Sequence, residues 1–351
     1  MSISISNIRI GQDCEPFIIA EMSGNHNQSL EKAIEIVRAA KRTGASAIKL
    51  QTYKPETLTI NVKNPDFLVD DNDSLWKGSY LFELYENAYT PWEWHEAIFN
   101  EAKSLGLVYF SSAFDESSVD FLETLDVPAY KIASFENSHL PLVKKIAATG
   151  KPVIVSTGMA TLEEIEETIS TLRENGCTEF ILLKCTSNYP ANPKSANLET
   201  IKDLRGRFGC EVGLSDHTLG VGVSVAAIAM GASVIEKHLT LTSADSGVDA
   251  DFSMSEEQMK NLVEECNNAW LAKGRISYGP TEEEIPSLKF RRSIYAISDI
   301  AVGDELTISN IGVIRPGFGL HPRNFEKLIG KTSSLNLQKG ERVTPGIVDL
   351  E

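Results

Sequence analysis

Short β-rich runs alternate with helical segments along most of this chain, and this alternation constrains the fold more than any other feature. Eight such runs have the length and composition of strands in β/α units. They lie at 17–21, 45–51, 107–112, 128–134, 152–157, 179–187, 211–217 and 233–241. Eight units predict a (β/α)8 TIM barrel of about 250 residues. A doubly wound sheet is the alternative, which the absence of a GxGxxG or GxxxxGK[ST] motif disfavours.

Capping signals predict where the intervening helices begin. Thr161–Glu164 and Ser255–Gln258 are capping boxes, and Thr90–Glu93 is a third with proline at the first helical position. A helix that begins at Ser29 places its apolar side chains on one face, as a helix lying on a sheet requires. The stretch 53–89 is too long for a simple connection, and we expect it to cover the mouth of the barrel.

The chain changes character near residue 280. Residues 281–290 form an acidic, proline-bearing linker, and short β-like runs separated by glycine turns follow it. The sequence therefore predicts a barrel over 1–280, a linker over 281–290 and a small all-β domain over 291–351.

Charge and cysteine content narrow the classes of protein. A net charge of −16 argues against nucleic acid or an anionic membrane as a partner. No apolar run reaches the roughly 18 residues that span a bilayer, and the N-terminal segment alternates like a strand and has no basic region of a signal peptide. The five cysteines include no CxxC pair, which predicts reduced thiols in a cytoplasmic enzyme.

Polar side chains end every predicted strand, where a barrel of this type carries its chemistry. They are Glu21, Lys49, Gln51, Ser112, Lys131, Ser134, Ser156, Ser187, Ser215, His217 and His238. Lys49 and Lys131 on one rim of an acidic protein predict a positive pocket for phosphate or carboxylate, with serine hydroxyls as further donors. For either lysine alone, the alternative is a side chain that extends into solvent.

His217 and His238 end the seventh and eighth runs, which are neighbours in a barrel. Two imidazoles so placed predict a shared metal ion with open positions for water and substrate, whereas an isolated histidine would favour a structural role. We expect Mn²⁺, with Mg²⁺ or Co²⁺ as alternatives, because the remaining ligands would be oxygens. His26 is a third candidate, as a ligand or a substrate contact.

Three functions agree with these residues. The first is a metal-assisted aldol-type condensation with a phosphorylated small molecule. The second is a metal-independent Schiff-base aldolase with Lys131 or Lys184 as nucleophile. The third is a non-catalytic carbohydrate-binding or structural protein built around the C-terminal domain, which the polar strand ends disfavour.

The motifs separate the first two, because the sequence resembles the sialic acid synthase family along essentially the full chain. IAEMSGNHN, AIKLQTY, PAYKIASFEN, STGMA, KCTSNYP, GLSDHTLG and VIEKHLTL stand in family order. The stretch from RRSIYAIS to GFGLHP resembles the family's antifreeze-like (SAF) domain, a β-clip fold. EMSGNHNQSL, KIASFEN and SGVDADFSM are most similar to the pseudaminic acid synthase branch.

The resemblance implies that phosphoenolpyruvate and water condense with 2,4-diacetamido-2,4,6-trideoxy-β-L-altropyranose to give pseudaminic acid and phosphate. N-acetylneuraminate or legionaminic acid synthesis, the same chemistry on another sugar, is the alternative. The phosphoenolpyruvate contacts implied are Lys49, Ser112, Lys131, Ser134, Ser156 and Ser215, and the sugar contacts are Gln51, Ser187, Tyr189, Asp249 and Arg315. His217 and His238 are the implied metal ligands, and Glu21 and Glu136 the implied catalytic acids. Ser112 and Ser187 depart from the threonine and asparagine usual in the neuraminate branch.

The mechanism that these groups support starts with a metal-polarised aldehyde, which C3 of phosphoenolpyruvate attacks. Water then adds at C2 with help from Glu21, and phosphate leaves by C–O cleavage beside the two lysines. We further expect a domain-swapped homodimer in which the linker carries Arg315 to the partner's barrel mouth. The alternative is an exposed turn arginine in an independent domain.

Overall fold

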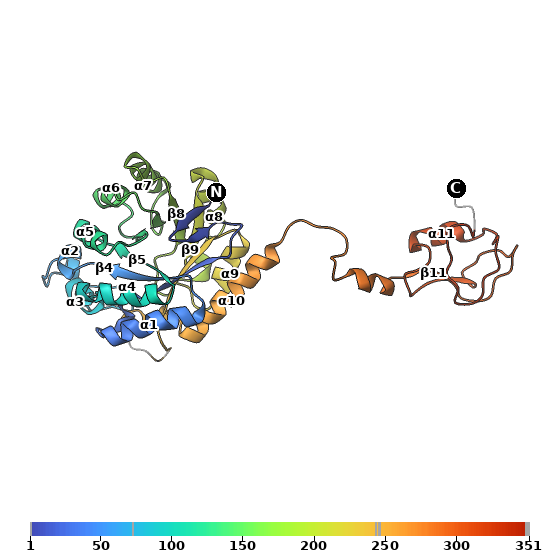
Figure 1. Cartoon of the computed structure of the whole chain (residues 1–351), viewed down its shortest axis with the longest axis horizontal. Coiled ribbons are helices and arrows are strands. Elements are labelled where there is room, and N and C mark those ends of the chain that lie inside the picture. The colour runs from blue at the N-terminus through green and yellow to red at the C-terminus, as the bar shows by residue number, and fades with distance from the viewer. Residues whose placement is uncertain (1, 72–73, 243, 245–246, 348–351) are drawn as a thin grey trace. The chain divides into compact units, whose positions relative to one another are not determined.

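The chain divides into two compact units, Met1–Gly274 and Arg275–Glu351. The structure, a computed structural model, describes residues 2–71, 74–242, 244 and 247–347 (Figure 1). The finer division at residues 280 and 290 stays a prediction.

The first unit is a closed barrel of eight parallel strands, which confirms the predicted TIM-barrel fold and excludes the doubly wound sheet. The strands are β3 (Phe17–Glu21), β4 (Ala47–Thr52), β5 (Val108–Ala113), β6 (Tyr130–Ile132), β7 (Val153–Ser156), β8 (Phe180–Cys185), β9 (Glu211–Ser215) and β10 (Val234–His238). Each strand pairs with the next along the chain, and β10 closes the ring on β3, with His238 opposite Glu21. The carboxyl ends of all eight therefore meet at one mouth.

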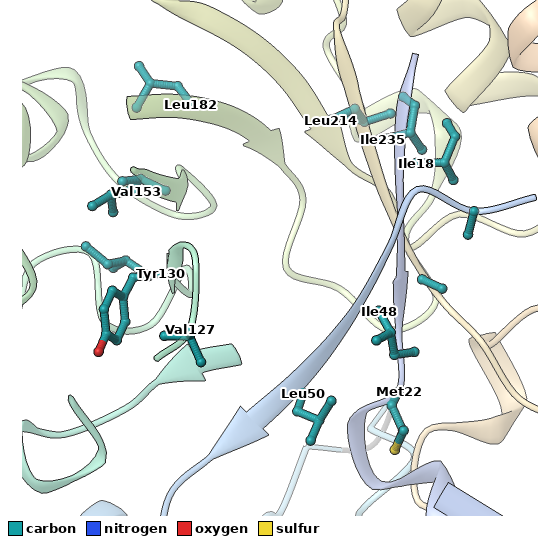
Figure 2. Packing of buried hydrophobic residues seen from close by; sticks show 14 of the residues in the cluster. Ile18, Met22, Ile48, Leu50, Val127, Tyr130, Val153, Leu182, Leu214 and Ile235 are labelled. Atoms are coloured by element: carbon teal, nitrogen blue, oxygen red, sulfur yellow. The ribbon is translucent and has the colours of Figure 1, made fainter. Parts of the chain in front are cut away.

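Side chains alternate between the inside and the outside of the barrel, because successive residues of a strand point to opposite faces. Outward residues such as Ile18, Ile48 and Ile235 belong to the large core beneath the helices (Figure 2). Inward residues such as Phe110 and Ile154 form a second core inside the barrel. An antiparallel hairpin of β1 (Ile3–Ile5) and β2 (Ile8–Ile10) adds its isoleucines to that inner core.

Helices ring the barrel in Figure 1 and bury its outer face. They are α1 (Leu30–Thr43), α4 (His95–Ser104), α5 (Glu116–Thr124), α6 (Leu140–Ala147), α7 (Leu162–Glu174), α8 (Thr200–Phe208), α9 (Gly222–Ala229) and α10 (Glu256–Lys273). Ser29 caps α1, and the capping boxes predicted at Thr161 and Ser255 are confirmed at α7 and α10.

The capping box predicted at Thr90 is wrong. Residues Trp92–Trp94 form a 3-10 turn before α4, and no side chain caps either element. The Thr90 hydroxyl instead lies 3.2 Å from Nε2 of His26. The hydroxyl that the sequence pattern predicted as a helix cap therefore makes a tertiary contact.

The stretch 53–89 contains α2 (Pro55–Leu58), a 3-10 turn over Pro65–Phe67 and α3 (Leu81–Ala88). Its Trp76 indole donates a hydrogen bond of 3.0 Å to the Val248 carbonyl, and its ring lies 5.7 Å from that of Tyr189. Because residues 189 and 248 follow β8 and β10, the stretch lies over the barrel mouth, as predicted. A cavity of about 430 Å³ lies beside Trp76 and Val248.

The second unit is small and mostly β or irregular. Strands β11 (Ser293–Ala296) and β12 (Ile311–Ile314) pair antiparallel, and a short helix, α11 (Phe325–Leu328), packs on a small apolar core of its own. None of the described helices combines the length and the apolar character that a bilayer crossing requires.

Candidate active site

The inward face of the barrel changes from apolar to ionic at the mouth. Lys49, at the inward face of β4, forms an ion pair of 2.6 Å with Glu21 Oε2 on β3 and donates a hydrogen bond of 3.1 Å to Ser112 on β5. Lys131 on β6 donates a hydrogen bond of 2.7 Å to Ser156 on β7. All five groups are buried, so their charges interact with little screening by water.

Glu236 joins the two lysines across the mouth. Its two carboxylate oxygens lie 3.9 Å from Nζ of Lys49 and 3.9 Å from Nζ of Lys131, and it accepts a hydrogen bond of 3.0 Å from Ser215. Since Glu236 is also buried, two ammonium groups converge on one carboxylate inside the barrel. Lys49 also has Glu21 at 2.6 Å, whereas the nearest carboxylate oxygen of Lys131 is 3.9 Å away. An ammonium without a close carboxylate is what an anion site requires.

Burial and neighbouring charges act against each other in this cluster. Burial opposes the charge of Glu236, but Lys131 and Lys49 outweigh it and hold the pKa of that carboxyl below its usual value. Burial raises the pKa of Glu21, although Lys49 works against the shift. Burial lowers the pKa of Lys131. Its nearest carboxylate oxygen is 3.9 Å away, whereas Lys49 has one at 2.6 Å. Lys131 is thus the ammonium most in need of an anionic ligand.

A chain of hydrogen bonds runs from Glu21 to the loop after β10. The Gln51 amide donates to Glu21 at 3.1 Å and to the Ser23 hydroxyl at 3.0 Å. The Ser23 hydroxyl donates in turn to Asp249, which is buried. The structure therefore connects Gln51 and Asp249, two of the predicted sugar contacts, to the carboxylate beside Lys49.

His217 and His238 lie side by side among aromatic rings. Their ring centroids are 5.4 Å apart, and Phe252 contacts both rings, while Tyr189 lies 4.5 Å from His217. Burial, together with the charges of His217 and Lys49, lowers the pKa of His238 well below its usual range, so its ring is neutral. A neutral imidazole is the form that binds a metal ion.

The two rings fit a divalent metal ion. Nδ1 of His217 lies 3.0 Å from the Thr186 carbonyl, and a proton held there leaves Nε2 with a free lone pair, as in most metal-binding histidines. Nδ1 of His238 is buried and has no hydrogen-bond partner among the described residues. No group of three or more His, Cys, Asp or Glu side chains gathers for a metal in the described part of the chain.

Three further predicted residues lie in loops at the same mouth. The Ser134 hydroxyl accepts a hydrogen bond of 3.2 Å from the Gly158 backbone, and a Cβ at Gly158 would meet both the Ser134 and the Ser187 hydroxyl oxygens at under 3 Å. Glycine at this position lets the two serines approach each other. Burial raises the pKa of Glu136 to about 7, although Lys131 works against the shift, and its Oε2 is buried with no hydrogen-bond partner in the described part of the chain.

Comparisons with known proteins identify the family of the chain. The model of the NeuB family matches residues 36–278, and that of the SAF domain matches residues 291–346. The chain belongs to the NeuB family. The predicted family and its small C-terminal SAF domain are thereby confirmed.

Relatives of known name cover almost the whole chain. The pseudaminic acid synthase of Campylobacter jejuni subsp. jejuni serotype O:2 is 42% identical over 95% of this chain and 97% of its own length. The N,N'-diacetyllegionaminic acid synthase of Legionella pneumophila is 37% identical over 94% of each chain. The crystal structure of the N-acetylneuraminic acid synthetase of Leptospira borgpetersenii in complex with citrate has a TM-score of 0.73 and 29% identity, covering 83% of this chain and 96% of that one.

Two residues named from the sequence, Lys184 and His26, do not join the site at the barrel mouth. Lys184 is an outward residue of β8, and its Nζ donates to the Cys185 carbonyl at 2.7 Å, so it cannot serve as a nucleophile inside the barrel. His26 accepts a hydrogen bond from the Gln28 backbone at Nδ1 and contacts Thr90 at Nε2, so it is a structural histidine. Arg315 is an exposed residue of the second unit, and its contact with the sugar stays a prediction.

Sequence reasoning missed Glu236, the residue on which both lysines converge. The signal was present, because Glu236 is two residues before His238 on one strand, and residues two apart share a face. An ionisable side chain on the inward face of β10 had to enter the same mouth as the histidine.

Proposed function

We propose that the protein is a pseudaminic acid synthase, a transferase that condenses phosphoenolpyruvate with 2,4-diacetamido-2,4,6-trideoxy-β-L-altropyranose and water. The observation that carries the proposal is the pair of buried lysines beside two adjacent imidazoles at one barrel mouth. The identity of 42% to a pseudaminic acid synthase, against 37% to a legionaminic acid synthase, supports the choice of sugar.

Phosphoenolpyruvate carries a phosphate and a carboxylate, and the site offers two ammonium groups with hydroxyls around them. In our proposal Lys49 and Lys131 bind these anionic groups with Ser112, Ser156 and Ser215. Ser134 is the remaining hydroxyl of this set. An incoming anion would replace Glu236 as the nearest anionic partner of Lys131, because the 3.9 Å contact between them is too long for a hydrogen bond.

His217 and His238 would hold a divalent ion, for which Mn²⁺ is our first expectation. When bound, such an ion supplies a Lewis acid for the aldehyde oxygen of the open-chain sugar. Tyr189, Asp249, Gln51 and Ser187 would orient that sugar beside the two rings.

The reaction forms a C–C bond and a bond between C2 and the oxygen of water, and it breaks the C2–O bond to phosphate. The proton that water loses balances the proton that the aldehyde oxygen gains. C3 of phosphoenolpyruvate attacks the aldehyde carbon, and water adds to the electron-deficient C2 after losing a proton to a carboxylate. The C2–O bond to phosphate breaks, and the lysines stabilise the departing dianion. We assign the orientation of the water to Glu21, which is held by Lys49, Gln51 and the Ser23 backbone. Glu136, with a pKa of about 7, can take up and release the proton near neutral pH.

We also propose a homodimer in which the SAF domain of one chain covers the barrel mouth of the other. Ile276 and Tyr278 are 92% and 94% exposed, and Ile285 and Phe290 are exposed as well. A segment with so many exposed apolar side chains needs a covering surface, and a second copy of this chain would supply it. Arg315 would then reach the acetamido groups of the sugar in the partner's site. A cytoplasmic location stays a prediction.

The test is release of phosphate from phosphoenolpyruvate by the purified protein with Mn²⁺ and one sugar at a time. We expect release with the diacetamido-trideoxy-altrose, and far less with N-acetylmannosamine or the legionaminic acid precursor. Release that is fastest with either of the other sugars would overturn the substrate assignment, and no release with any of them would overturn the reaction.

A further inference from the structure

A buried ion pair lies directly behind the two histidines, on the outer side of the barrel. Asp216 precedes His217 and Lys237 precedes His238, and Lys237 Nζ lies 2.8 Å from Asp216 Oδ2. The side chains of both are 1% exposed. Because neighbouring residues of a strand point to opposite faces, the pair points away from the mouth and into the apolar layer under the helices.

Both carboxylate oxygens of Asp216 and the ammonium of Lys237 make further hydrogen bonds. Asp216 Oδ1 accepts from the backbone and the hydroxyl of Thr218, at 2.9 and 2.8 Å, and Oδ2 accepts from Ser224 of α9 at 2.6 Å. Lys237 donates a second hydrogen bond of 2.6 Å to the Thr218 carbonyl. The network therefore fixes the chain on both sides of His217 and ties it to the residue before His238.

Stability of the fold is a weak explanation for this pair. Removing two charges from water costs about as much as their attraction returns, and replacement of buried pairs by apolar residues is often neutral or stabilising. The surrounding layer is apolar, with Leu214, Ile235 and Leu239 in its core, so apolar residues would suit both positions. The contacts between a carboxylate and an ammonium are directional, unlike apolar packing. They can therefore fix the position of the end of β9 relative to the end of β10.

We propose that the Asp216–Lys237 ion pair is a positioning device that holds the imidazoles of His217 and His238 at the separation that one divalent metal ion requires. The proposal rests on the metal site of the proposed function. Neither residue touches the mouth, so both are positioning residues and act through the histidine that follows each of them. Groups behind metal ligands commonly contribute about 10- to 100-fold to metal affinity.

The experiment measures Mn²⁺ binding to the full-length protein by titration calorimetry, without substrates, together with the melting temperature of the metal-free protein. The main variant is Asp216→Asn combined with Lys237→Met, which removes both charges and keeps both volumes. We expect a melting temperature close to that of the unmodified protein and a Mn²⁺ dissociation constant raised about 10-fold or more.

A matched control uses the other ion pair of β9. Arg205 lies 3.3 Å from Glu211, the first residue of that strand, whose side chain is 3% exposed. Arg205→Met combined with Glu211→Gln removes an ion pair between α8 and the first residue of β9, at the opposite end of the barrel, with Glu211 buried and Arg205 21% exposed. We expect Mn²⁺ affinity to stay within twofold of the unmodified protein, whatever happens to the melting temperature.

The outcomes separate this proposal from the metal site itself. If His238→Ala abolishes Mn²⁺ binding but the charge-free double variant binds Mn²⁺ like the unmodified protein, the pair serves the fold alone and the positioning role is refuted. If the unmodified protein binds no Mn²⁺, the metal site of the proposed function is wrong and the positioning role is overturned with it. If the double variant does not fold, Mn²⁺ binding is measured on Ser224→Ala instead. This substitution removes one hydrogen bond to Asp216 and keeps both charges of the pair. A several-fold weaker Mn²⁺ affinity supports the proposal, and an unchanged affinity overturns it.

Discussion

Replacing Lys131 by methionine should weaken the binding of phosphoenolpyruvate far more than it weakens the fold. Lys131 is 1% exposed, and its nearest carboxylate oxygen is 3.9 Å away. The substitution keeps the aliphatic volume and removes one charge-assisted contact to the substrate anion. Such a contact contributes about 1.5–3 kcal/mol, which corresponds to a roughly 10- to 100-fold higher KM for phosphoenolpyruvate or an equal loss in kcat/KM.

Lys49→Met should behave differently, because Lys49 is 2.6 Å from a glutamate that is itself 1% exposed. Its loss leaves Glu21 without its cation in a buried position, so we expect a lower melting temperature in addition to the kinetic defect. Lys184→Met is the matched control, since Lys184 is an outward residue of the barrel wall and donates only to Cys185 and Thr186. Steady-state kinetics and thermal melts of the three variants check these expectations. A Lys131→Met protein with unchanged KM and kcat would refute the anion pocket.

Three more predictions concern the chemistry and the assembly. A chelator should abolish activity and Mn²⁺ restore it, and borohydride with substrate should leave no adduct on Lys131 or Lys184, whereas an adduct found by mass spectrometry would favour the Schiff-base aldolase. Because burial raises the pKa of Glu136 to about 7, its protonated form dominates below that pH and its ionised form above it, so the profile of kcat/KM against pH should show an inflection near 7. Glu136→Gln should remove the inflection, and a profile that keeps it would assign the inflection to another group. Arg315→Ala and His238→Ala chains should each be nearly inactive alone and regain activity when co-refolded, and heterodimers that stay inactive would show that the arginine does not act across the interface.

The sequence was sufficient for the barrel because its signals are periodic and repeated. Eight runs at regular spacing fix the number of strands, and the carboxyl end of each strand then fixes which residues meet. Glu21, Lys49 and His238 were therefore found without knowledge of a single distance. Lys184 was a candidate nucleophile by residue type alone. The alternation of side chains along β8 places it on the outer face of the barrel, away from the mouth, and this excludes the role.

Tertiary contacts account for what the sequence did not reveal. Thr90 has every local sign of a helix cap, yet its hydroxyl contacts His26, which lies 64 positions earlier in the chain. The same contact makes His26 structural and removes it from the candidate ligands. The pairing of Asp216 with Lys237 could not be predicted either, because the distance between β9 and β10 side chains depends on the register of the closed barrel.

The most direct test of the account follows the bridging oxygen of phosphoenolpyruvate. The purified protein is incubated with Mn²⁺, the diacetamido-trideoxy-altrose and phosphoenolpyruvate that carries ¹⁸O between C2 and phosphorus, and the released phosphate is analysed by mass spectrometry. Cleavage of the C–O bond after attack of water at C2 predicts that the label appears in phosphate and that pseudaminic acid forms in equal amount. Unlabelled phosphate would mean attack at phosphorus, and it would contradict the chemistry that we assign to the two lysines and the two histidines.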